Sequence, residues 1–91
     1  MKKTVFALFS IAALALPLAA QAGAKCEAHP KAEWMKEADA KAKLEADGYK
    51  IRKFKVDGQC YEIYGWNKEG KKVEIYFDTK TLDIVKAEIE K

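Results

Sequence analysis

The sequence predicts an α+β fold in which one N-terminal helix packs on a four-stranded antiparallel β-meander. Three observations support this prediction. Residues 31–47 contain many good helix formers and no breaker, and the run ends at Gly48. After Gly48 the hydrophobic period changes to two, which is typical of strands. Three short turn motifs then divide the rest of the chain into four segments of strand length.

The first 22 residues are expected to be a cleaved signal peptide. Two lysines follow the initiating methionine, residues 5–16 are apolar, and the Ala-Gln-Ala pattern at 20–22 suits a signal peptidase. The apolar run is shorter than the roughly 20 residues of a spanning helix. We therefore expect a periplasmic or secreted protein without stable membrane insertion after cleavage. Cleavage after Ala24 is the alternative.

Removing 22 of the 91 residues leaves 69, which is one small domain whose core alone is marginal. Residues 23–30 form a tail that carries Cys26, and residues 31–91 form the α+β domain. Two of the 17 basic residues leave with the signal, so 15 basic residues stand against 14 acidic ones. This balance gives no support to a nucleic-acid partner.

The two cysteines, Cys26 and Cys60, are expected to form a disulfide because an even count in a small exported domain is typical of one. Closing this loop stabilises the fold by roughly 3–4 kcal/mol in the chain-entropy model. Alternation along the strand, however, directs Cys60 away from the helix. Either the tail curls around the sheet or a bulge rotates Cys60, and the sequence leaves both possibilities open.

The helix is expected over 31–47, with Pro30 in its first turn and Gly48 as its C-terminal cap. The side chains expected to face the sheet are Trp34, Met35, Ala38 and Ala42, with Leu44 on the flank. The strands are expected over 49–56, 59–66, 71–77 and 82–89. They are joined by a two-residue Asp57-Gly58 turn, a three-residue loop at 68–70 and a tight turn at 78–81.

These turns fix the register and therefore the two faces of the sheet. The core face has Tyr61, Ile63 and Gly65 opposite Phe77, Ile75 and Val73, with Phe54 opposite Tyr61 and with Leu82 and Ile84 beside Phe77 and Ile75. The other face carries Tyr49, Ile51, Tyr64, Trp66, Tyr76 and Val85, with Lys53 opposite Glu62 and Lys72 opposite Trp66.

Part of this second face is the candidate partner-binding surface, because tyrosine and tryptophan are enriched at binding hot spots. Its residues are Glu62, Tyr64, Trp66, Glu74 and Tyr76. The alternative is that the aromatic rings only cover one another and the stems of neighbouring lysines.

The sequence resembles the small, exported, single-domain members of the PepSY family. The resemblance rests on Cys26, Pro30-Lys31, Trp34, the run Leu44 to Tyr49, the run Gly58 to Tyr64, Gly70, Val73-Glu74, the run Tyr76 to Asp78, and Thr81. Thr79 and Leu82 depart from the family, in which many members have proline and glycine there. The resemblance implies a helix packed on an antiparallel sheet and a role in inhibiting or chaperoning a peptidase.

No catalytic residue, metal site or cofactor is expected. His29 is the only histidine and is expected to be exposed ahead of the helix, and the only serine, Ser10, lies in the signal. Glu62 and Glu74 share one face, but nearby lysines predict ordinary solvated carboxylates without raised pKa values.

Two functional hypotheses follow. The first is a non-catalytic binding or regulatory module that acts on a separate protein, such as a secreted peptidase or an envelope protein. The second is an accessory protein that binds a small ligand, a metal ion or a redox partner of the cytochrome type.

Overall fold

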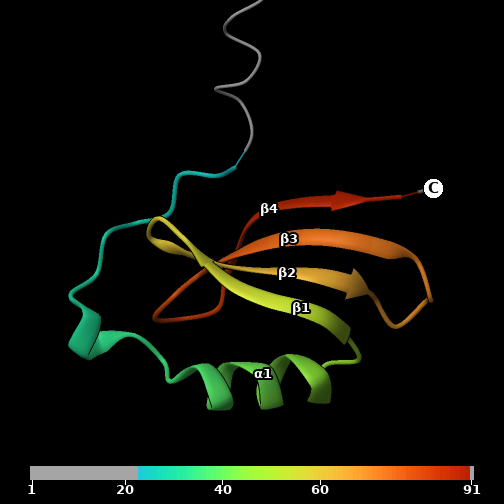
Figure 1. The fold of residues 1–91 in the computed structure, drawn as a ribbon, viewed down its shortest axis with the longest axis horizontal. Helices are drawn as coiled ribbons and strands as arrows, with labels where there is room; N and C mark the ends of the chain where they lie inside the picture. Colours follow the sequence, from blue (N-terminus) through green and yellow to red (C-terminus); the bar gives the residue numbers. More distant parts are fainter. Residues whose placement is uncertain (1–22, 91) are drawn as a thin grey trace, which may run out of the picture.

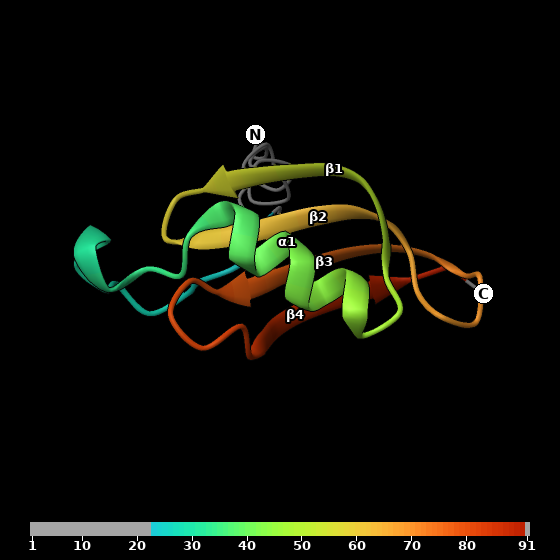
Figure 2. The ribbon, with the colours of Figure 1, turned by 90° about the horizontal axis from the view of Figure 1, so that it is seen from below.

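The strands indicated by the period-two pattern form one antiparallel sheet with the order β1-β2-β3-β4, and one helix precedes them (Figure 1). The computed structural model describes residues 23–90, so the expected signal peptide, residues 1–22, lies outside the described part. The elements are the 3-10 helix η4 (Lys31–Glu33), α1 (Glu37–Ala46), β1 (Lys50–Asp57), β2 (Cys60–Trp66), β3 (Lys72–Asp78) and β4 (Ile84–Ile89). The predicted α+β class is confirmed, and α1 lies across one face of the sheet (Figure 2).

The helix is shorter than the sequence predicts, because the chain is extended between η4 and α1. Trp34 and Lys36 both have extended backbone angles, with ψ of 142°. Two contacts outweigh helix propensity here: the Trp34 indole N–H donates to the His29 carbonyl (2.8 Å), and the Met35 N–H donates to the Thr79 carbonyl (2.8 Å). The end of the helix is as predicted, with Gly48 in the left-handed region at φ 105°.

This interruption changes the helix face that packs on the sheet. Ala40 and Leu44 are buried, one turn apart, whereas Ala38 and Ala42 are exposed. The predicted apolar stripe of the helix was therefore wrong at Ala38 and Ala42, because neither side chain is buried against the sheet. Trp34 and Met35 still pack against the core, from the extended segment and not from the helix. The buried cluster consists of Ala40, Leu44, Tyr61, Ile63, Val73, Ile75 and Phe77.

The register between β2 and β3 is the one predicted, with Tyr61 opposite Phe77 and Ile63 opposite Ile75. Between β1 and β2 the turn is Gly58-Gln59 and not Asp57-Gly58, because Asp57 pairs with Cys60. The predicted partners Phe54–Tyr61 and Lys53–Glu62 are therefore wrong. The observed pairs are Phe54–Ile63, Val56–Tyr61, Lys53–Tyr64 and Lys55–Glu62. The shift is two residues, so most side chains keep their predicted face.

Because of a bulge in β1, the side chains at the start of that strand lie on the opposite face of the sheet from the predicted one. The register shifts between Ile51 and Lys53, and this extra residue turns Ile51 toward the helix side. Tyr49 and Ile51 consequently pack against the core cluster. The bulge also brings the Lys50 carbonyl against Gly65, so that a methyl group at position 65 would overlap the carbonyl oxygen.

The connection between β3 and β4 is longer than the predicted tight turn. The Leu82 N–H donates to the Asp78 carbonyl (2.9 Å), and the Asp78 N–H donates to the Asp83 carbonyl (2.9 Å). As a result Ile84, and not Leu82, begins β4, and Ile84 lies opposite Phe77 instead of Ile75. Leu82 adopts a left-handed backbone (φ 65°) and packs its side chain against the core.

Gly65→Ala tests the close approach of β1 to β2. The added methyl group overlaps backbone, which has no rotamer to escape into, so we expect the free energy of unfolding to fall by about 3 kcal/mol. Gly70→Ala is the matched control, because its site is open and only the left-handed backbone (φ 83°) opposes the change, at roughly 1–2 kcal/mol. Denaturant unfolding measures both variants. Equal losses of unfolding free energy in the two variants would contradict the close contact between Gly65 and the Lys50 carbonyl.

Candidate functional site

The N-terminal tail is held on the sheet by the predicted disulfide between Cys26 and Cys60, whose Cα atoms are 5.4 Å apart. Cys60 pairs in regular register with Asp57 on one side and Asp78 on the other, so no bulge rotates it. The tail instead curls around the end of the sheet: it runs over the face opposite α1 and then turns to reach the helix side (Figure 1). We call the face opposite α1 the far face.

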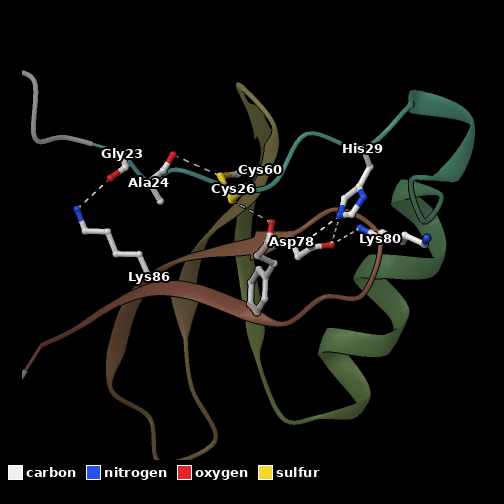
Figure 3. Close-up of a disulfide and its surroundings, with 9 residues drawn as sticks. Gly23, Ala24, Cys26, His29, Cys60, Asp78, Lys80 and Lys86 are labelled. Atoms are coloured by element: carbon white, nitrogen blue, oxygen red, sulfur yellow. Dashed lines mark hydrogen bonds and ion pairs between the residues drawn. A yellow bond between two sulfur atoms is a disulfide. The ribbon is translucent and has the colours of Figure 1, made fainter.

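Further contacts fix the tail on both sides of the disulfide (Figure 3). The Lys86 ammonium donates to the Gly23 carbonyl at 3.1 Å. His29 Nε2 lies 3.1 and 3.0 Å from the two carboxylate oxygens of Asp78. Cys26 Sγ lies 3.6 Å from the Phe77 carbonyl oxygen, which is a contact and not a hydrogen bond because a disulfide sulfur carries no proton.

His29 is therefore not the exposed residue that the sequence predicts, since only 11% of its side chain is accessible. Glu27, His29 and Asp78 bring three atoms of metal-ligand type within 4.8 Å of one another. The Asp78 carboxylate is already engaged in hydrogen bonds. Its Oδ1 accepts hydrogen bonds from the backbone N–H groups of Lys80 (2.8 Å) and Thr81 (3.0 Å) and also lies within hydrogen-bond distance of His29. The arrangement acts as an anchor between the tail and the β3–β4 turn.

The pKa of Asp78 reflects this anchor. Burial of Asp78 favours the neutral carboxyl, but hydrogen bonds from His29, Thr81 and Lys80 favour the carboxylate more, and the pKa falls from 3.8 to about 2. A folded-state pKa below the unfolded one means that the carboxylate stabilises the fold above about pH 4. This contribution, on the order of 2 kcal/mol, is lost as the pH falls from about 4 to about 2.

Four residues at the centre of the far face form a compact polar group that we call the Glu–Tyr quartet: Glu62 and Tyr64 on β2, and Glu74 and Tyr76 on β3. Glu62 lies opposite Tyr76, and Tyr64 lies opposite Glu74, so the two carboxyl groups occupy one diagonal and the two phenols the other. The Tyr76 hydroxyl donates to Glu74 Oε2 at 3.0 Å.

The quartet is far less accessible than an uncovered sheet face. Glu62 is 1% exposed and Tyr76 is 4% exposed, while Tyr64 and Glu74 are half-buried. The Lys55 ammonium lies 3.8 Å from Glu62 Oε1, but Glu62 Oε2 finds no hydrogen-bond donor among the described residues. A buried carboxylate oxygen without a donor is costly, which favours a proton on this group.

The pKa values follow from that burial. Burial, and then the hydrogen bond between the two carboxyl groups, raises the pKa of Glu62, while the same bond lowers the pKa of Glu74. The hydrogen bond to Glu62 raises the pKa of Tyr64 to about 12, and burial raises the pKa of Tyr76. The prediction of ordinary solvated carboxylates was therefore wrong for Glu62. The two shifts have opposite directions, so a proton bound by this pair is held by Glu62 in preference to Glu74.

The exposed parts of the far face lie around the quartet. A hollow of about 350 Å³ is lined by Tyr64, Lys72, Val73, Glu74, Glu88, Ile89 and Glu90. A second hollow, of about 490 Å³, is lined by Gly48, Lys50, Trp66, Asn67, Lys68 and Gly70. Of the five predicted partner-binding residues, Glu62 and Tyr76 are thus buried, whereas Tyr64, Trp66 and Glu74 are half-buried and border these hollows. Partner binding by this face stays a prediction.

Comparisons with known proteins give one match. The family described as "Peptidase propeptide and YPEB domain" (PepSY_2) matches residues 5–88. No curated protein and no solved structure matches the chain. Within residues 23–90, no helix is both long enough and apolar enough to cross a membrane.

Glu62→Gln tests the protonated state of the quartet. The raised pKa means that ionised Glu62 opposes folding above that pKa and that the penalty disappears below the ordinary value of 4.5. The amide can donate to Glu74 without carrying charge. At pH 7 we expect the variant to be more stable than wild type by roughly 1 kcal/mol, or about 4–8 °C in Tm.

Thermal unfolding between pH 4 and 8 measures this effect, and the difference in Tm should shrink toward the acid end. Glu45→Gln, on the exposed side of α1, is the control and should leave Tm unchanged at every pH. A Glu62→Gln variant that melts at or below the wild-type temperature at pH 7 would contradict the raised pKa of Glu62.

Proposed function

Because the chain belongs to the PepSY family of peptidase propeptide and YPEB domains, we propose that it is a non-catalytic, exported binding module that regulates a separate peptidase through its far face. The observation that carries the proposal is the position of Tyr64 and Trp66. Both side chains are half-buried, both lie on the face opposite α1, and each borders a hollow. Amphipathic rings held in this way are typical hot-spot residues at protein interfaces.

The far face suits recognition better than chemistry. In the quartet, Glu74 accepts a hydrogen bond from Tyr76, and the pKa of Glu62 is raised by its burial and by its bond to Glu74. His29 is engaged by Asp78. Each of these three groups already takes part in contacts that stabilise the fold. A rigid surface with a few placed polar atoms is what a binding module needs.

The surface also has a defined charge pattern. Lys72 lies beside Trp66, and Glu74, Glu88 and Glu90 lie around the hollow next to Tyr64. A partner that fits here presents an apolar or aromatic group to the rings and a basic group to the three carboxylates. We favour this function over the accessory-protein alternative, since the oxygens of Asp78 in the Glu27–His29–Asp78 group are committed to hydrogen bonds.

The test is binding and inhibition of secreted peptidases of the producing cell. The exported protein is immobilised, retained peptidases are identified by mass spectrometry, and each is then assayed with the soluble protein. We expect a retained peptidase to be inhibited or stabilised, and we expect Tyr64→Ala and Trp66→Ala to weaken binding by roughly 30-fold or more, as hot-spot truncations do.

Lys43→Ala is the matched control, because Lys43 is exposed on α1 at the opposite side of the sheet. It should bind like wild type. The proposal is wrong if no peptidase is retained, or if both aromatic variants bind a retained peptidase with wild-type affinity while circular dichroism shows all variants folded.

A further inference from the structure

We propose that the edge strand β4 pairs antiparallel with β4 of a second copy of this chain, with Ala87 of each copy at the two-fold axis. This inference concerns the edge of the sheet and is independent of the function proposed for the far face. It rests on three observations: exposed apolar residues on β4, the outward direction of particular backbone groups, and a charge pattern that is complementary to itself.

The two edges of the sheet differ in how they are protected. Edge strands commonly carry lysines or other charges that discourage pairing with another chain. Strand β1 follows this rule, since its only large exposed apolar residue, Val56, accompanies four basic residues: Lys50, Arg52, Lys53 and Lys55. Strand β4 does not. Its Ile84, Val85 and Ile89 are 54%, 42% and 51% exposed, and they account for half of its six residues.

The backbone of β4 defines which residues can pair outward. The Glu90 N–H donates to the Lys72 carbonyl of β3 at 2.9 Å, and Glu88 and Lys86 follow it in regular register opposite Glu74 and Tyr76. In an antiparallel ladder, alternate residues direct their N–H and C=O groups to the same neighbour. The backbone groups of Ala87 and Ile89 therefore point away from β3, to the open edge, whereas the register shift between Tyr76 and Phe77 leaves Val85 in a bulge outside this alternation.

These outward residues are the ones that a two-fold axis at Ala87 would use. Ala87 would form a hydrogen-bonded pair with Ala87 of the second copy, and Ile89 would lie opposite the bulged Val85 of the second copy. This pairing would cover the exposed side chain of Ile89 in both chains, and its removal from water favours association.

The charges select this register. Around Ala87, Lys86 lies opposite Glu88 of the second copy, and Glu88 lies opposite Lys86 of the second copy. Because Lys86 and Glu88 of one chain are already 3.5 Å apart, the four charges of the dimer would form a square in which each charge has two neighbours of opposite sign. An axis shifted by one residue would place Lys86 against Lys86 or Glu88 against Glu88. Like charges directly opposite each other are destabilising, so those registers are disfavoured.

The resulting dimer has a continuous eight-stranded sheet. A two-fold axis normal to the sheet keeps both α1 helices on one side and both far faces on the other. Two copies of the surface around Tyr64 and Trp66 would then face the same direction. This arrangement gives the two copies equivalent access to partners without covering either far face.

Sedimentation of the exported protein between micromolar and millimolar concentrations tests the proposal. We expect wild type to be in a concentration-dependent monomer–dimer equilibrium. Lys86→Glu and Glu88→Lys each convert both ion pairs into like-charge pairs, and each should weaken dimerisation by roughly tenfold or more. Arg52→Glu is the matched control, because it makes the same change of charge on the opposite edge and should leave the equilibrium unchanged.

Two further samples, in which opposite charges again face each other across the two strands, distinguish a loss of pairing from damage to the fold. The double variant Lys86→Glu/Glu88→Lys is again self-complementary and should dimerise like wild type, although it lacks the Lys86 contact with Gly23. An equimolar mixture of the two single variants should form a heterodimer, because both facing pairs are then opposite in sign. Ala87→Pro removes the outward N–H, which an edge strand tolerates, and should give a folded monomer.

A wild-type protein that stays monomeric up to millimolar concentration would overturn the inference. So would single charge variants that dimerise like wild type, or a double variant and a mixture that both stay monomeric while circular dichroism shows the fold intact.

Discussion

The disulfide between Cys26 and Cys60 is the constraint on which the arrangement of the far face depends. It ties the tail to the start of β2 at the point where β2 lies between Asp57 and Asp78. With this point fixed, His29 reaches Asp78 and Gly23 reaches Lys86. A sheet of four strands with one short helix has only one well-covered face, and the tail supplies contacts to the other. The covalent bond offsets the marginal core of so small a domain.

The central position of Glu62 and its neighbouring side chains explain why the quartet differs from a solvated pair of carboxylates. Glu62 is central on the sheet, with β1 and β3 on either side, and its neighbours Tyr64, Tyr76 and Lys55 cover it. Burial therefore raises the pKa of Glu62, and the hydrogen bond to Glu74 adds to that rise. The proposed recognition surface consequently consists of the half-buried Tyr64, Trp66 and Glu74 and not of the buried Glu62 and Tyr76.

Local chemistry predicted much of this fold, and long-range contacts account for what it missed. The end of the helix at Gly48, the β2–β3 register and the disulfide partners all depend on local turn chemistry or on cysteine count. The break before α1, the bulge in β1 and the burial of Glu62 depend on contacts between residues far apart in sequence, such as Met35 with Thr79. Many members of the family have glycine at position 82, and this preference indicates a left-handed backbone there. Leu82 does adopt the left-handed backbone that glycine favours.

The position of the tail depends most directly on the covalent state of Cys26 and Cys60, which intact-mass spectrometry after alkylation measures. The protein from the exported fraction is unfolded in denaturant without reductant, so that burial cannot protect a thiol, and is then treated with iodoacetamide. We predict no added alkyl group before reduction and two after it. Alkylation of either cysteine before reduction would contradict a tail held on the far face by the disulfide.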